Sequence, residues 1–216
     1  MLAMSNKTRE LPRVIPVFPL PGVILLPHAM MPLHIFESRY IDMVNDALAG
    51  DKIIGMVQPI NMDNESRPEL YETGCAGFIA EHNELEDGRY LITLEGKCRF
   101  RIKKELQTTS EPYRIVEADC SPYAADMDAG GIALQNRPEL TAAIKQHLAR
   151  IASNIDLSRL ERLSDEQLVN GGAMLVPFTP PEKQALLEAD SLADRAAILM
   201  ALLNMDGAEP GAPLLQ

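Results

Sequence analysis

The sequence predicts an α+β fold in which a β-rich part comes first and a helical part follows. In the first part, short apolar segments are separated by Gly and Pro, and several alternate apolar with polar residues, as strands do. Later in the chain, apolar residues recur every three to four positions, as on one face of a helix. Because the strands are short and do not repeat, we expect a small Greek-key barrel over residues 11–122 and a helical bundle over residues 132–205.

The stretch from Arg13 to Tyr40 is the centre of the predicted barrel. It has no charged residue between Arg13 and Glu37, and an apolar run of about 20 residues can cross a bilayer as a helix. Its prolines exclude such a helix, because each removes a backbone donor and clashes with the preceding turn. These prolines are Pro16, Pro19, Pro21, Pro27 and Pro32. We therefore expect short buried strands and no membrane segment.

The prolines and Gly22 divide this stretch into short pieces. We expect strands over Val14–Phe18, Val23–Leu26 and Pro32–Ile35, with a turn at Leu20–Gly22. A helix should follow near 37–49, where apolar residues fall on one face.

Further strands complete the predicted barrel. Gly50 should take the left-handed conformation that ends a helix, and Asp87-Gly88 is a strong turn signal. A half-exposed strand should start after Gly96, where Cys98, Phe100 and Ile102 alternate with basic residues. The other expected strands are Lys52–Gln58, Gly74–Glu81, Arg89–Glu95 and Tyr113–Ala118.

About four helices are expected after a linker over residues 123–137. One covers Glu139–Ser153, and two others open at capping boxes, Ser164 with Gln167 and Thr179 with Glu182. The last helix opens at Ser191. Residues 1–10 and 206–216 have the composition of flexible tails.

The composition of the chain disfavours several classes of function. The chain has 216 residues with a net charge of −11, and a surface of that sign repels nucleic acid and anionic lipid. Its three cysteines do not suggest a disulfide framework. The first residues have no apolar core of a signal peptide, so we expect a cytoplasmic protein.

Three stretches in the same order carry a family resemblance. They are PVFPLPGVILLP with PLHIFESRY, then GCAGFI with DGRY, LEG and RFRI, and finally Pro177-Phe178 with EKQALLE and Arg195. They cover about residues 11–203, and the chain resembles the N-terminal substrate-binding domain of the Lon protease family. The resemblance implies a PUA-like β pseudobarrel with one inserted helix. It also implies recognition of exposed apolar segments in unfolded polypeptides, as an adaptor or together with a partner protease.

Motifs for catalysis are missing from this sequence. Lon proteases carry ATPase and Ser/Lys protease modules after this domain, but no G-x-x-x-x-G-K-[ST] phosphate loop occurs here. His28 and His34 lack zinc-ligand spacing, and Cys75 and Cys98 are expected as small buried residues. We therefore expect a free-standing, non-enzymatic domain with no metal and no cofactor.

Two arginines allow a binding or a structural interpretation. Arg39, with Glu37 and Tyr40, could form the polar rim of a groove, and Arg99 could act similarly. We favour ion pairs across the barrel for both arginines, with Glu37 at a helix start and Tyr40 in the core.

We expect the ligand to bind in a groove where the barrel meets the bundle, because ligands often lodge at such junctions. The predicted lining residues come from the apolar stretch: Phe18, Leu20, Met31, His34 and Phe36. The alternative is a small-molecule or RNA site on the PUA-like fold. RNA is disfavoured by the net charge, unless the basic run on one hairpin forms a patch. That run is Lys97, Arg99, Arg101, Lys103 and Lys104.

Overall fold

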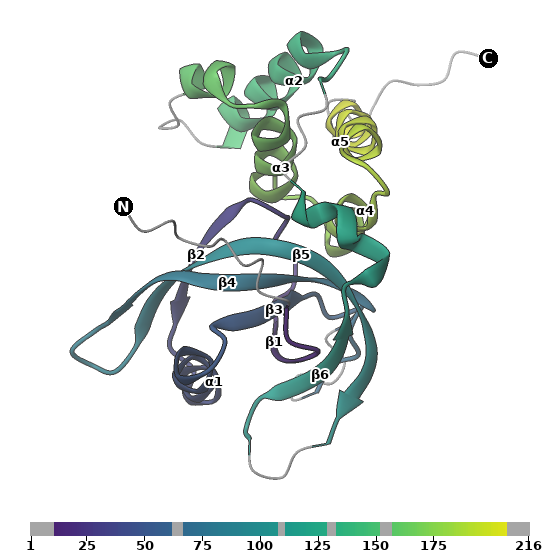
Figure 1. Ribbon diagram of the computed structural model, residues 1–216. Coiled ribbons are helices and arrows are strands. Elements are labelled where there is room, and N and C mark those ends of the chain that lie inside the picture. Colours follow the sequence, from purple (N-terminus) through teal and green to yellow (C-terminus); the bar gives the residue numbers. More distant parts are fainter. Residues whose placement is uncertain (1–10, 62–66, 108–110, 129–132, 152–156, 207–216) are drawn as a thin grey trace, which may run out of the picture.

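The computed structural model describes residues 11–61, 67–107, 111–128, 133–151 and 157–206, as a barrel with a helical part on one side (Figure 1). The α+β class is confirmed. The predicted tails, 1–10 and 206–216, lie outside the described residues, apart from Asp206 at the end of the last helix.

In the described ranges, six strands form one sheet that closes on itself. Their order is β2-β5-β4-β3-β1-β6, and β6 pairs in turn with β5. β1 and β3 are parallel, and the other neighbours are antiparallel. The strands are β1 (Val14–Pro19), β2 (Met30–Ile35), β3 (Ile53–Val57), β4 (Thr73–Glu84), β5 (Tyr90–Leu106) and β6 (Arg114–Asp119).

The long strand β5 makes this closure possible. Its first residues, Tyr90–Glu95, pair with β2, and residues Arg101–Leu106 pair with β6. Along most of its length the other edge of β5 pairs with β4. β2 is therefore an extra strand beside the first half of β5, outside the closed ring.

One helix belongs to the barrel part and the others follow it. The helix α1 (Ser38–Ala49) buries four residues in the core: Tyr40, Met43, Val44 and Ala47. Figure 1 shows the later helices above the sheet, with η1 and α4 close to it. They are the 3₁₀ helices η1 (Ser121–Met127) and η2 (Leu157–Arg162) with α2 (Arg137–Ile151), α3 (Asp165–Leu175), α4 (Pro180–Glu188) and α5 (Leu192–Asp206).

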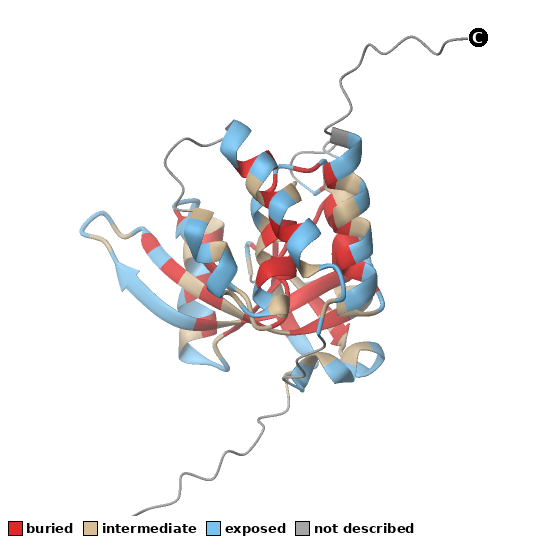
Figure 2. Cartoon of the chain, turned by 90° about the horizontal axis from the view of Figure 1, so that it is seen from above, coloured by how far each residue is buried: buried red, intermediate tan, exposed pale blue. Residues whose placement is uncertain are grey.

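The apolar core runs without a break from the barrel into the helices. One buried cluster contains Leu25 and Leu94 from the barrel part together with Leu186 and Leu199 from α4 and α5. Buried positions accordingly gather where the helices meet the sheet (Figure 2). A separation into subdomains 11–122 and 132–205 remains a prediction, because the two parts share this core.

Three local predictions are wrong. The segment Val23–Leu26 is not a strand, although its residues 24–26 are fully buried. Gly96 does not separate two strands, because β5 runs straight through it. A Cβ atom at Gly96 would lie 2.0 Å from the Leu26 carbonyl oxygen, so glycine is needed for close approach. Gly50 has φ −111°, and the left-handed residue is Lys52, with φ 62°.

The helix-start predictions are confirmed. In α3, Gln167 N donates to Ser164 Oγ at 3.2 Å and Ser164 N donates to Gln167 Oε1 at 3.0 Å. In α4, Thr179 N donates to Glu182 Oε2 at 2.8 Å, and Pro180 occupies the first helical position. The expected linker over 123–137 is partly helical, because η1 extends to Met127.

Candidate functional site

Arg99 of β5 joins the barrel to the helical part. It is 4% exposed, and its Nε and Nη2 each donate to the Asp126 carboxylate of η1 at 2.8 Å. Its Nη1 donates to the carbonyl oxygens of Leu187 and Ala189, at the end of α4, at 3.0 and 2.6 Å. The Tyr123 ring lies 4.5 Å from the guanidinium carbon. Arg99 thus forms an ion pair, as predicted, but with η1 and not across the barrel. The guanidinium also satisfies carbonyls left open at a helix end.

Two buried amides make a second connection between the same parts. Gln58, after β3, donates through Nε2 to Gln184 Oε1 at 3.0 Å and to the Pro180 carbonyl at 3.1 Å. The Nε2 of Gln184 in turn donates to the Thr73 carbonyl of β4 at 3.1 Å. Gln58 Oε1 accepts from the Gly22 amide at 3.0 Å. These bonds satisfy polar groups that burial would otherwise penalise.

Two cations satisfy helix ends inside the bundle. Lys183 Nζ donates to the Ala173 and Met174 carbonyls, both at 2.7 Å, and Arg195 Nε donates to the Leu186 carbonyl at 2.9 Å. Burial lowers the pKa of Lys183 to about 8. The stretch EKQALLE with Arg195, one of those that carry the family resemblance, therefore supports the architecture.

A different region faces solvent and combines apolar side chains with a regular backbone. We define the outer face as the solvent-facing residues of three neighbouring strands plus Phe36. The face consists of Met30, Pro32 and His34 from β2, Leu91, Thr93 and Glu95 from β5, Phe78, Glu81 and Asn83 from β4, and Phe36. In the strand register, Met30, Glu95 and Phe78 form one row, and His34, Leu91 and Asn83 form another. Residues opposite one another in neighbouring strands share a face, so these rows form one surface.

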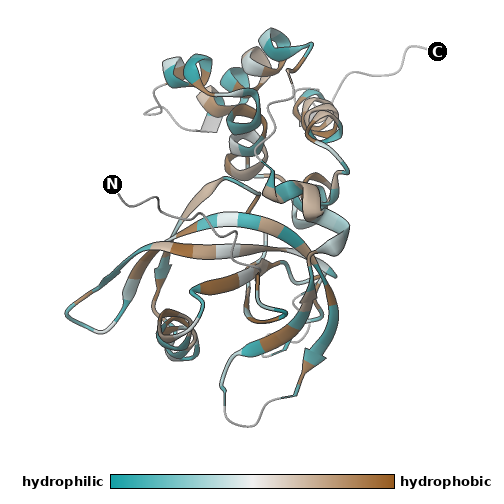
Figure 3. Cartoon of the chain, viewed as in Figure 1, coloured by the Kyte–Doolittle hydropathy of each residue, from teal (hydrophilic) through white to brown (hydrophobic). Residues whose placement is uncertain are grey.

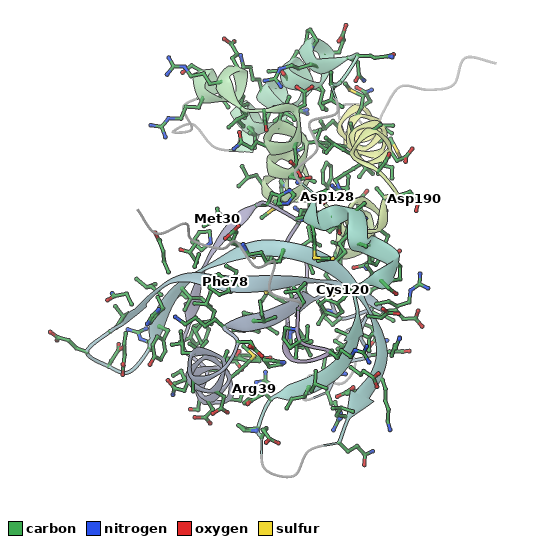
Figure 4. All side chains as sticks on the ribbon, in the orientation of Figure 1. Met30, Arg39, Phe78, Cys120, Asp128 and Asp190 are labelled. Carbon is green, nitrogen blue, oxygen red and sulfur yellow. The ribbon has the colours of Figure 1, made fainter. Side chains whose placement is uncertain are left out.

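Large apolar groups on the outer face are unusually open to solvent. Met30 is 51% exposed, Leu91 46% and Phe36 62%. Phe36 extends the row of β2, and its ring centroid lies 5.8 Å from that of His34. Figure 4 labels Met30 and Phe78 on the sheet below the helical part, and Figure 3 shows brown and teal segments alternating along these strands. An antiparallel sheet normally places polar residues on its solvated face, so this composition suits binding.

The predicted lining residues separate into two groups. Phe18 and Met31 are buried, at 8% and 7% exposure, and the Phe18 ring packs 4.4 Å from Tyr40. Leu20 is half-buried against the core. His34 and Phe36 are exposed and lie together on the outer face. Their binding role remains a prediction.

Sequence reasoning missed Leu91, and Met30 is not among the predicted lining residues. The alternation around Leu91, between buried Tyr90 and Ile92, already indicates an outward position. Nothing in the sequence shows that β2 is its neighbour, because the two strands are about 60 residues apart.

β2 also offers a strand edge. It is last in the strand order, and in the described parts of the chain no strand pairs with its second edge. Pro32 lies within β2, as prolines do in edge strands, because it has no N–H to donate. An exposed edge can accept an additional strand.

The junction of barrel and bundle holds a polar pocket. It has a volume of about 540 Å³ and includes Arg101 of β5, Tyr123 of η1, and Glu188 and Asp190 at the end of α4. The groove expected at this junction is therefore lined largely by charged and polar groups, unlike the outer face.

Three of the five cations in the basic run on β5 are paired with carboxylates. Lys97 pairs with Glu95 at 2.6 Å, Lys103 pairs with Asp119 at 3.2 Å, and Arg99 is buried against Asp126. These carboxylates offset positive charge that binding of RNA phosphates would require. The other predicted ion pair is local: Arg39 pairs with Glu37 at 2.8 Å, two residues earlier, and not across the barrel.

The described residues show no arrangement typical of a metal site. Among them, no three His, Cys, Asp or Glu side chains come together for a metal ion. His28 is half-buried, and its Nδ1 lies 2.9 Å from Glu166 Oε1 of α3. Cys75 and Cys98 are buried, as predicted. No described helix has the length and apolar content needed to cross a bilayer.

A closed barrel joined through one core to a helical bundle defines an α+β domain, which carries exposed apolar side chains on its outer face. The profile of the ATP-dependent protease La (LON) substrate-binding domain matches residues 14–205, and the chain belongs to this family. Two solved structures share the fold, the Lon N-terminal domain protein of Xanthomonas campestris and the N-terminal domain of Mycobacterium avium complex Lon protease. Their TM-scores are 0.62 and 0.61, at 21% and 18% identity, covering 87% and 88% of this chain and 97% and 98% of theirs.

Curated relatives are longer than this chain. The Lon protease of Flavobacterium johnsoniae is 29% identical over 209 residues, which are 94% of this chain and 25% of that protein. Lon protease 2 of Myxococcus xanthus is 28% identical, with 93% of this chain and 24% of the relative covered. The chain thus spans about a quarter of the length of these relatives.

Proposed function

We propose that this chain is a non-catalytic binding protein that recognises extended apolar segments of unfolded polypeptides on its outer face. The observation that carries the proposal is the exposure of Met30, Leu91 and Phe36 on one regular sheet surface. Membership of a substrate-binding domain family supports it. Apolar area removed from water contributes about 25 cal/mol per Å², so these side chains can supply affinity without a deep pocket.

The free edge of β2 supports an extended binding mode. A polypeptide added beside β2 would continue the sheet through its main chain, independently of its sequence. Its alternate side chains would then lie beside Met30, Pro32 and His34, since alternate residues of a strand share a face. Recognition of unfolded polypeptides requires a site that accepts many sequences and prefers apolar residues.

We place the protein in the cytoplasm, as an adaptor that passes bound segments to a partner protease. The relatives are named Lon proteases, and this chain aligns with the part that their family describes as substrate-binding. Binding without chemistry is consistent with Arg99, Gln184 and Lys183, whose hydrogen bonds described above hold the fold together.

A titration with labelled peptides tests this proposal. One peptide is extended and apolar at alternate positions, and the second has the same length with those positions changed to serine. We expect saturable binding of the first alone, with little change between low and high salt, because apolar contacts are not screened. Equal binding of both peptides would contradict the proposal. Stronger binding of a single-stranded RNA, lost at high salt, would favour the alternative of an RNA site.

A further inference from the structure

Two cysteines meet where η1 leaves the barrel. Cys98 lies on β5, and Cys120 ends the connection from β6 to η1. The Cys98 Sγ atom lies 4.0 Å from the Cys120 carbonyl oxygen and 3.2 Å from the Tyr123 carbonyl oxygen. The Cys98 and Cys120 thiols are also in hydrogen-bonding contact with each other. Figure 4 labels Cys120 beside the sheet, below the helical part.

The two thiols differ in exposure and acidity. Cys98 is fully buried, whereas Cys120 is partly exposed. The hydrogen bond with Cys98 lowers the pKa of Cys120, and the same contact together with burial raises the pKa of Cys98. Because the thiolate is the nucleophile, Cys120 is the thiol that can react first, and Cys98 keeps its proton.

We propose that Cys98 and Cys120 form a peroxide-sensitive thiol pair that oxidises to a disulfide. The Cys120 thiolate attacks one oxygen of hydrogen peroxide, the O–O bond breaks, and hydroxide leaves, so that Cys120 becomes a sulfenic acid. The Cys98 sulfur then attacks the Cys120 sulfur, the S–O bond breaks, and the Cys98 proton leaves with the hydroxyl group as water. The two thiols lose two electrons in total, and peroxide gains them.

The bond would form at the contact that already holds barrel and helices together. Arg99 is next to Cys98, and its partner Asp126 lies in the helix that starts after Cys120. Oxidation would therefore add a covalent link between β5 and η1 beside this ion pair. The role is separate from polypeptide binding on the outer face, which contains neither cysteine.

Peroxide treatment of the whole chain tests the proposal, and the third cysteine, Cys75, is the internal control. Cys75 is fully buried, and burial raises its pKa, so it should stay reduced. The folded protein is treated with hydrogen peroxide, quenched with catalase, denatured, and alkylated before peptide mapping. We expect one peptide pair crosslinked through Cys98 and Cys120, one alkylated thiol at Cys75, and full reversal by dithiothreitol. Three alkylated thiols, or a crosslink between two chains, would overturn the proposal.

Two variants separate the roles of the sulfur atoms. Cys98→Ala should stop the reaction at the sulfenic acid of Cys120, which dimedone traps. Cys120→Ser should leave Cys98 reduced under the same treatment. Dimedone labelling at Cys98 in the Cys120→Ser protein would reverse the assignment. The mapping of the unmodified chain decides the proposal even if a variant does not fold.

Discussion

Arg99 and Asp126 form a bidentate ion pair, with two donor–acceptor distances of 2.8 Å, at the point where the barrel meets the helices. Both side chains are at least nine-tenths buried. The same guanidinium holds two carbonyls at the end of α4, so one residue of β5 fixes η1 and α4 together. The relative position of barrel and bundle thus depends on a few directional bonds as well as on the shared apolar core.

Replacing Arg99 with alanine should destabilise the protein strongly. The change leaves two buried carbonyls without the guanidinium donor, and the buried Asp126 carboxylate keeps the backbone N–H of residue 99 but loses its ion-pair partner. Breaking a buried pair costs about 3–5 kcal/mol. Arg39→Ala is the matched control, because it breaks an exposed pair with Glu37 whose contribution is below about 1 kcal/mol. Urea unfolding of both variants measures the difference, and equal midpoints would show that the buried pair is not essential.

A methyl group at Gly96 should disturb the packing of β5. The added Cβ would overlap the Leu26 carbonyl oxygen, which is backbone and cannot rotate away, so we expect a loss of about 3 kcal/mol, the upper range of overpacking. Gly171→Ala is the control: α3 has open space there, and alanine should stabilise a helix interior by about 0.5–1 kcal/mol. Changes of the same sign in thermal unfolding would contradict the stated role of Gly96.

Lys183 should give the protein a stability that rises with pH in the alkaline range. Its folded pKa is lowered to about 8 by burial, against about 10.4 in an unfolded chain. Between these values the unfolded state binds more protons, so raising the pH favours folding. Urea midpoints at several pH values across this window should show a steeper rise for the unchanged chain than for Lys183→Met. Lys145→Met, at a surface pair with Glu161, should leave the slope as it is.

Local signals in the sequence were sufficient for some elements and not for others. The capping boxes at Ser164 and Thr179 were predictable, because all their groups lie within four residues. Gly96 wrongly predicts a strand break, because the residue that requires glycine there, Leu26, is 70 residues away in the sequence. The apolar run at 23–26 wrongly predicts a strand, because burial alone does not distinguish a strand from a packed irregular segment.

The candidate site was only partly accessible to sequence reasoning for the same reason. An apolar stretch predicts proximity to a core, but not which residues face away from it. Phe18 and Met31 point inward, whereas Phe36 and Met30 are exposed. Leu91 completes the outer face through a strand pairing between β2 and β5 that no short motif encodes.

Recognition of polypeptides at the outer face is tested most directly by the affinity of an outer-face variant for the extended apolar peptide. The variant combines Met30→Thr, Phe36→Ser and Leu91→Thr. The control combines Val14→Thr, Leu175→Gln and Met205→Gln, which remove exposed apolar groups elsewhere on the surface. We expect the first variant to bind at least about tenfold more weakly while the control binds as the unchanged chain does, since a tenfold loss is about 1.4 kcal/mol. Unchanged affinity in the first variant, with both proteins folded, would contradict recognition at the outer face.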